Sequence, residues 1–243
     1  MDLSLAALVV ALVAVLVGSC IQGSLGFGLG LVAAPVLVII DTTLVPSVVL
    51  GMGVPLTYLV AWRERAALDL RRVSWAIAGR VPGTVLGSVA VLALSERWLA
   101  GLFAVAILLA VAASVVGLGV EPTRRAMFVA GAGSGFMGTA TSVGGPPMAL
   151  LLQHEEGPEL RASMAAFMAF GATISLAALV VVGEFDRHAL IVTAVLVPAV
   201  LVGFGTSRWT NPVLDRGYTR PAVLVFAAAS ALSILVRDVI GLV

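Results

Sequence analysis

Two glycine-rich stretches carry residue types that could bind an anion inside an otherwise apolar chain. They are GSLGFGLGLVAAP, residues 23–35, and GFMGTATSVGGPP, residues 135–147. Glycine lets a backbone approach a ligand closely, and the first turn of a helix presents free N–H groups and partial positive charge. We therefore expect anion binding where these stretches bend. The candidate binding residues are Gln22, Gly23, Ser24, Gly26, Phe27, Gly28, Arg80, Gly135, Gly138, Thr139, Thr141, Ser142, Gly144 and Gly145.

The same glycines have a second interpretation, because small residues also let membrane helices pack closely. Scattered small residues are well explained in that way. Two clusters at matching positions, each followed by a proline, favour the interpretation in which the bends line a ligand site. Irregular backbone at membrane depth is tolerated where it is buried in protein or lines a polar cavity.

The elements that position these stretches are predicted to be membrane helices. The chain has 243 residues, of which 60% are hydrophobic and 11% are charged, whereas soluble domains average about 25% charged residues. Apolar stretches of membrane-spanning length recur at 44–62, 73–94, 98–118, 162–183, 189–207 and 221–236. The fold class is therefore an all-α polytopic membrane protein that spans the bilayer several times.

The N-terminal run could be mistaken for a cleaved lipoprotein signal, because LVGSC at 16–20 follows an apolar segment. A signal peptide normally begins with a basic region, whereas this chain begins Met1-Asp2. The run also continues into the first glycine-rich stretch. We interpret it as the first membrane segment.

The chain contains an internal duplication, with halves at 1–120 and 121–243. The two glycine-rich stretches align at one offset, and the later parts of the halves align after a four-residue insertion. The matched pairs are Gly23 with Gly135, Gly26 with Gly138, Pro35 with Pro147, Ser47 with Ser163, Thr57 with Thr173, Pro82 with Pro198, and Gly87 with Gly203. The last two pairs predict equivalent bends in the two halves.

The distribution of arginine predicts the topology. If each glycine-rich stretch forms a hairpin that enters and leaves on one side, loops 63–72, 119–125, 153–161 and 208–220 share a side and hold ten arginines against three. If each stretch crosses once, the ratio is eight to five. The positive-inside rule favours the hairpin arrangement, with both termini in the periplasm. Each half then has a broken-helix hairpin plus three transmembrane helices, so the two repeats have inverted topology, as in many secondary transporters.

Arg80 is the one charge well inside a predicted span. Its guanidinium group could form a fork with a sulfonate or carboxylate. Alternatively, the side chain extends to the cytoplasmic surface, as arginines near helix ends commonly do. We expect the second orientation, since the counterpart in the second half, Leu196, is apolar.

Several classes of chemistry are excluded by the residues available. All 13 acidic residues lie outside the apolar segments or at their ends, which argues against a carboxylate proton relay and against a divalent-cation site. Cys20 is the single cysteine, which excludes an internal disulfide and is too little for a thiolate metal site. His154 and His188 are far apart in sequence, so we expect no metal site and no cofactor. An intramembrane enzyme would need a nucleophile, a metal cluster or an acid–base pair, so we predict a protein that is not an enzyme.

The glycine cluster, its second copy GSGFMGTATSVGGPP, and the paired VPGTVLGS and VPAVLVGF resemble the sulfite exporter TauE/SafE family of membrane transporters. The resemblance spans the whole chain, although TATSVGGPP stands where the family more typically has a denser glycine run. It implies a multi-pass transporter of the bacterial inner membrane. The implied substrates are small sulfur-containing anions such as sulfite, sulfoacetate or other organosulfonates, with export as the favoured direction.

The partners implied are therefore a small anionic substrate and the lipid bilayer, with no nucleic acid. Alternative functions are an uptake permease for another small organic anion, such as a carboxylate, and an anion channel. Substrate identity, direction of transport and oligomeric state stay open at this point.

Overall fold

The computed structural model of the chain describes residues 4–93, 121–152 and 157–213, together with isolated residues between and after these ranges. The described elements are all helical. They are α1 (Leu5–Leu25), α2 (Leu29–Ile40), η1 (Thr42–Leu44), α3 (Ser47–Arg63), η2 (Arg65–Ala67), α4 (Leu70–Ala93), α6 (Arg124–Thr141), α7 (Gly145–Leu151), α8 (Gly157–Val182) and α9 (Arg187–Val213).

Five of these segments are long and apolar enough to cross a membrane, as the composition predicts. They are Leu5–Leu25, Thr42–Arg63, Val73–Ala93, Gly157–Val182 and Arg187–Val213. They include four of the predicted spans, 44–62, 73–94, 162–183 and 189–207. The remaining two predicted spans, 98–118 and 221–236, lie outside the continuously described residues.

Helix α1 begins at a side-chain cap and continues without a break into the first glycine-rich stretch. Oγ of Ser4 accepts a hydrogen bond from the backbone N–H of Ala7, which satisfies one free donor of the first turn. Cys20 lies inside the helix, one turn before its end. This helix is long and apolar enough to cross a membrane, as the interpretation of the segment as a membrane helix predicts. At 1.5 Å per residue α1 is about 31 Å long and α2 about 18 Å, so only α1 has the length of a full span.

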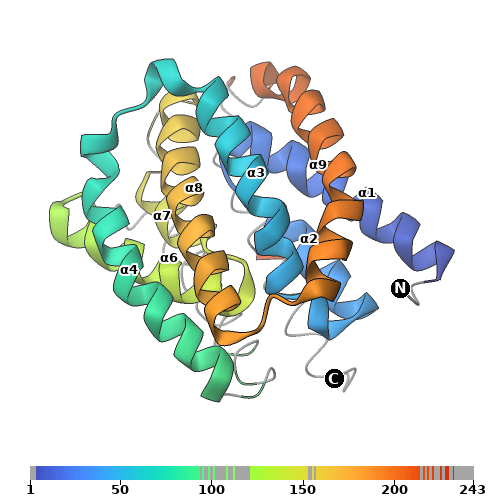
Figure 1. Cartoon of the computed structure of the whole chain (residues 1–243). Helices are drawn as coiled ribbons and strands as arrows, with labels where there is room; N and C mark the ends of the chain where they lie inside the picture. The colour runs from blue at the N-terminus through green and yellow to red at the C-terminus, as the bar shows by residue number, and fades with distance from the viewer. Residues whose placement is uncertain are drawn as a thin grey trace.

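The helices pack in two close pairs with a third pair between them. Figure 1 shows α1 with α9 at one side of the molecule and α4 with α6 at the other, while α3 and α8 lie in the middle. The third pair, α3 and α8, runs antiparallel. Tyr58 contacts Thr173, and Glu64 near the end of α3 contacts Arg161 near the start of α8.

The pair α4 and α6 runs parallel, with almost no space between the two backbones. Gly79, Gly83 and Gly87 of α4 lie in turn against the backbones of Phe128, Ala132 and Phe136 of α6. A Cβ at Gly87 would lie only 2.7 Å from the carbonyl oxygen of Phe136. This spacing of small residues is the usual way in which membrane helices approach closely.

The pair α1 and α9 repeats this arrangement. Gly203 of α9 lies against Leu16 and Ser19 of α1, and Gly23 of α1 lies against Ser207 of α9. Because the contacting residue numbers rise together, α1 and α9 are also parallel. The predicted pair Gly87 and Gly203 thus has one role in both halves, which is to admit the backbone of a neighbouring helix.

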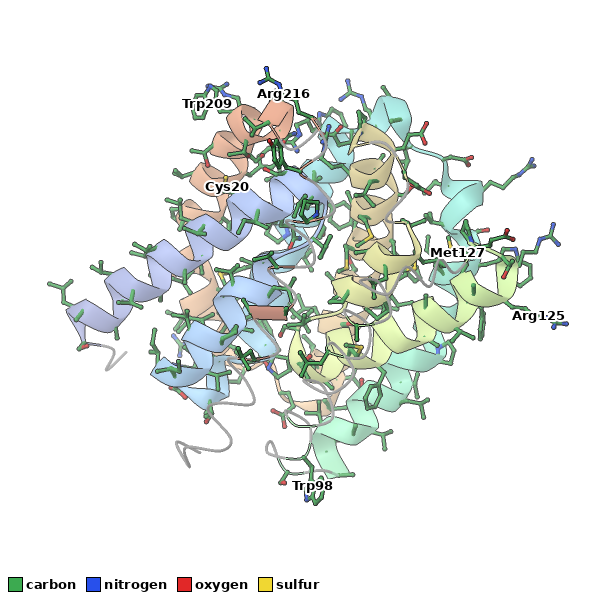
Figure 2. The ribbon with its side chains drawn as sticks, turned by 180° about the vertical axis from the view of Figure 1, so that it is seen from behind. Cys20, Trp98, Arg125, Met127, Trp209 and Arg216 are labelled. Carbon is green, nitrogen blue, oxygen red and sulfur yellow. The ribbon has the colours of Figure 1, made fainter. Side chains whose placement is uncertain are left out.

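The four tryptophans lie exposed toward the ends of segments. The exposed fractions are 70% for Trp62, 45% for Trp75, 73% for Trp98 and 63% for Trp209. Figure 2 shows Trp209 and Trp98 at opposite ends of the molecule. Exposed tryptophan at helix ends is typical of the belts that contact the membrane–water interface.

Candidate functional site

The first glycine-rich stretch forms a sharp bend between α1 and α2. Gly26 has φ +84° and Gly28 has φ +141°, a backbone region that glycine adopts without the steric cost of a side chain. The bend brings Gln22 back over the start of α2, where its Oε1 accepts a hydrogen bond of 2.9 Å from the N–H of Leu29. The side chain of Gln22 therefore caps α2 and occupies one of its free donors.

Gly23 and Ser24 lie just before this bend and face α9. Ser24 Oγ donates to the carbonyl of Cys20 at 2.8 Å and is also hydrogen-bonded to Thr210. The carbonyl of Gly23 accepts a hydrogen bond from Arg63. These two predicted site residues hold the end of α1 against its neighbours.

The second glycine-rich stretch bends at Ser142, where φ is +65°. Oγ of Ser142 donates to the carbonyl of Pro46 at 3.0 Å, and Thr141 donates to the carbonyl of Met137 one turn earlier at 2.7 Å. Helix α7 then begins at Gly145, followed by Pro146 and Pro147. Because proline has no N–H group, α7 offers fewer backbone donors to a ligand than an ordinary helix start.

The other predicted residues of the second stretch have packing partners. Thr139 is fully buried and is hydrogen-bonded to Ser175 of α8 at 2.7 Å. Gly135 lies against the backbone of α4, where a Cβ would be 2.5 Å from the carbonyl oxygen of Arg80. The carbonyl of Gly144 accepts a hydrogen bond from Ser134. Close helix packing, the second interpretation of the glycines, therefore accounts for Gly135 as it does for Gly23.

The two bends contact each other inside the protein. The ring of Phe27 lies against Gly145, where a Cβ would be 2.5 Å from a ring carbon, and Gly30 lies against the carbonyl of Ser142. Phe27 is only 1% exposed. Gly26 and Gly138, the matched pair of the duplication, are both buried. Residues more than a hundred positions apart in the sequence thus form one junction.

Arg80 points into the protein and not toward a surface, so the expected surface orientation is wrong. Its side chain is 2% exposed. Nη1 donates to Oγ of Ser134 at 3.0 Å and to the sulfur of Met168 at 3.6 Å, and the guanidinium carbon lies 4.7 Å from the centre of the Phe167 ring. The inward orientation is favoured because a hydroxyl, a thioether and an aromatic face all surround the charge.

Room for this side chain is created by two glycines. A Cβ at Gly138 would lie 2.9 Å from Nη2 of Arg80, and one at Gly171 would lie 2.5 Å from Cδ and closer still to Nε. Gly138 was predicted as a site residue, whereas Gly171 was not. A single glycine in an apolar span gives no sequence signal of its own, since its partner lies 91 residues away on another helix.

Nε of Arg80 is buried without a hydrogen-bond partner among the residues that the structure describes. Nη1 donates all of the hydrogen bonds that the Arg80 side chain forms with the described residues. Buried polar groups are almost always paired in proteins, and a buried charge without a counterion is more costly still. The side chain therefore has unused capacity to bind an anion.

A charged cluster of Arg63, Glu64 and Arg161 lies beside the first bend. It was not predicted from the sequence. Glu64 accepts from Nε of Arg63 at 2.9 Å and from Nε of Arg161 at 3.3 Å. Arg63 also donates to Ser207 at 2.7 Å and lies over the ring of Phe204. In the sequence, Arg63 and Arg161 lie at the ends of apolar segments. We therefore expected them to be loop arginines on the cytoplasmic side. The exposed side-chain fractions of 24%, 12% and 6% for Arg63, Glu64 and Arg161 show a largely buried network instead.

The groups gathered around the junction are chemically able to bind an anion. Within the described ranges, no group of three His, Cys, Asp or Glu side chains lies close enough to hold a metal ion. Arg80, hydroxyl groups and bent backbone lie around the junction of the two hairpins. Such groups can hold a small oxyanion by charge and by hydrogen bonds.

A comparison with known protein families gives a match to the model described as Sulfite exporter TauE/SafE, which covers residues 10–234. Comparisons with curated proteins and with solved structures gave no match. The family match covers nearly the whole chain, including both bends and Arg80. The chain is a multi-pass membrane protein and belongs to the TauE/SafE sulfite exporter family, which is a family of membrane transporters and not of enzymes.

Proposed function

We propose that this protein exports small sulfur-containing anions, such as sulfite, sulfoacetate or other organosulfonates, across the bacterial inner membrane by alternating access. The observation that carries the proposal is the contact between the two bends, with Phe27 against Gly145 and Gly30 against Ser142. Broken helices that meet inside the protein are a recurrent plan of substrate sites in secondary transporters. The family match supports the substrate class.

The two halves, 1–120 and 121–243, act as inverted repeats in this proposal. The helix contacts support it, because the pair α1 and α9 would exchange with the pair α6 and α4 under such symmetry, and both pairs are parallel. Helix α3 would exchange with α8, and these two run antiparallel. Each half has one broken-helix hairpin and two long helices among the described elements. The third spans of the two halves, 98–118 and 221–236, lie outside the continuously described residues and are part of the proposal only.

The substrate path is proposed to pass the junction of the two hairpins. Gly26, Phe27 and Gly28 would line it from the first bend, and Gly138, Gly144 and Gly145 from the second. Gln22, Gly23, Ser24, Gly135, Thr139, Thr141 and Ser142 hold these bends in place through the contacts described above. When the pair α1 and α9 tilts against the pair α4 and α6, the junction would open first to one side and then to the other.

The membrane potential can drive export without proton coupling. No carboxylate lies inside the predicted spans, so a carboxylate proton relay is not available. Expelling one negative charge from a cell that is negative inside gains about 2.3 kcal/mol per 100 mV. That free energy supports roughly a fiftyfold accumulation outside, because about 1.4 kcal/mol corresponds to a factor of ten.

Flux into proteoliposomes under an imposed potential tests the proposal. We expect saturable movement of sulfite or an organosulfonate toward the positive side, at a rate that follows the potential. Flux that ignores the potential and follows a pH gradient would reject uniport. Linear, unsaturated flux would indicate a channel, preference for a carboxylate would indicate an organic-anion permease, and inactivity with every sulfur anion would reject the substrate class.

A further inference from the structure

We infer that the anion binds at the second bend alone, on the Nε–Nη2 edge of Arg80, and that this site selects anions with a single negative charge. The inference rests on the proposed transport function and identifies which residue holds the substrate. The two halves then differ in function, because only the first half supplies an arginine; its counterpart in the second half is Leu196.

The first bend has little unused capacity for an anion. The start of α2 is capped by Gln22, whose Oε1 accepts a hydrogen bond from the N–H of Leu29. The nearby charges of Arg63 and Arg161 are both directed at Glu64, at 2.9 and 3.3 Å. Groups that are already paired gain little from a ligand, because binding would first break the existing hydrogen bonds.

The second bend differs because its cation lacks a partner carboxylate in the part of the chain that the structure describes. Nη1 of Arg80 is used by Ser134 and Met168, which are both uncharged. Nε is buried without any partner there. A bound anion would supply the missing counterion, so binding relieves a cost that the empty protein carries.

The free edge of Arg80 also has the right shape for an oxyanion. Nε and Nη2 lie on the same edge of the planar guanidinium group and can donate two parallel hydrogen bonds to two oxygens of a sulfonate or sulfite. This edge lies between the backbones of Gly138 and Gly171. Gly171 of helix α8 covers the edge in this structure, so the inference requires that α8 moves away from α4 during the transport cycle to admit the anion.

Charge balance sets the selectivity. One guanidinium neutralises one negative charge, and the remaining close contacts of Arg80 are to a hydroxyl, a thioether and the ring of Phe167. A monoanion leaves the buried site neutral. A dianion leaves one buried negative charge without a partner, which is strongly unfavourable. Among the proposed substrates, the site therefore selects hydrogensulfite and sulfonates with one negative charge over sulfoacetate and fully deprotonated sulfite, which carry two.

Ligand-induced thermal stabilisation of the full chain in detergent tests the inference, with methanesulfonate as the monovalent probe and sulfate as the divalent one at equal ionic strength. We expect methanesulfonate to raise the unfolding temperature and sulfate to raise it much less. Arg80→Gln should weaken methanesulfonate binding about tenfold to a hundredfold, and Arg80→Lys should retain part of it. Arg208→Gln, at an exposed arginine beside Trp209, is the matched control and should bind normally.

Unchanged binding in Arg80→Gln, equal stabilisation by sulfate, or no stabilisation of the wild type by methanesulfonate would each overturn the inference. The unfolding temperature without anion identifies a merely structural role. Removing an unpaired buried charge should leave this temperature unchanged or raise it, whereas loss of a structural contact should lower it. Normal sulfonate flux by Arg80→Gln in proteoliposomes would reject the inference and leave the proposed function intact, while inactivity of the wild type would reject the proposed function.

Discussion

The guanidinium group of Arg80 fills the space that a side chain at residue 171 would need. A Cβ built on Gly171 would lie 2.5 Å from Cδ of Arg80 and closer still to Nε, so the inward path of this arginine depends on a glycine of another helix. We expect Gly171→Ala to displace the guanidinium group and to reduce transport at least tenfold. Substrate flux in proteoliposomes measures the effect.

Gly133→Ala is the matched control for this change, because a Cβ at Gly133 meets no atom within 4 Å. This variant adds the same methyl group to a neighbouring helix, α6, and should transport at the wild-type rate. Equal rates for Gly171→Ala and the wild type would show that the position of Arg80 does not matter for transport.

The close approach of α4 and α6 predicts a large cost for small additions at their interface. A methyl group at Gly83 would overlap the carbonyl of Ala132, which is backbone and cannot rotate away. We expect Gly83→Ala to destabilise the protein by about 1–3 kcal/mol, seen as a lower unfolding temperature in detergent. Gly205→Ala is the control, because a Cβ at Gly205 would meet no atom within 4 Å, and this variant should unfold at the wild-type temperature. Equal unfolding temperatures for Gly83→Ala and Gly205→Ala would contradict the close packing of α4 against α6.

Glu64 balances two arginines in the charged cluster beside the first bend, and its neutralisation should destabilise the protein. Glu64→Gln leaves Arg63 and Arg161 facing each other without the carboxylate that both contact, at 2.9 and 3.3 Å. We expect a loss of about 1.5–3 kcal/mol, the range for hydrogen bonds to charged groups. Adding Arg161→Met should recover part of this loss, because it removes one of the two positive charges that face each other in Glu64→Gln. Purely additive effects in the double variant would indicate that the two residues do not interact.

The distribution of arginine predicts that both termini face the periplasm. Ten arginines lie in loops on one side of the hairpin arrangement and three lie on the other, and basic loops remain in the cytoplasm. Reporter enzymes fused to the C-terminus should be active when they require the periplasm and inactive when they require the cytoplasm. The opposite pattern would reject the hairpin topology.

Much of the fold could be predicted from local sequence because its causes are local. Apolar length predicted α3, α4, α8 and α9, since a membrane helix satisfies its backbone internally and needs only enough apolar residues to cross. The glycine clusters predicted the two breaks. Only glycine accepts the φ of +84° at residue 26 and +141° at residue 28 without strain.

The role of each glycine could not be predicted, because it depends on which helix lies opposite. Gly135 and Gly138 belong to one cluster and are three residues apart, yet Gly135 admits the backbone of α4 and Gly138 admits the side chain of Arg80. The charged cluster of Arg63, Glu64 and Arg161 was missed for the same reason. Its members are brought together by the packing of α3 against α8.

Arg80 is the clearest example of the difference between what the amino-acid sequence determined and what the tertiary structure determined. The sequence by itself determined that one positive charge lies within an apolar helix and that two glycine-rich breaks exist, because residue type and spacing control those features. Only the tertiary structure decided that the charge turns inward, at 2% exposure, toward the second break. A long side chain extends to water when its neighbours fill the interior. It stays inside when glycines on adjacent helices leave space and when hydroxyl and aromatic groups there accept the charge.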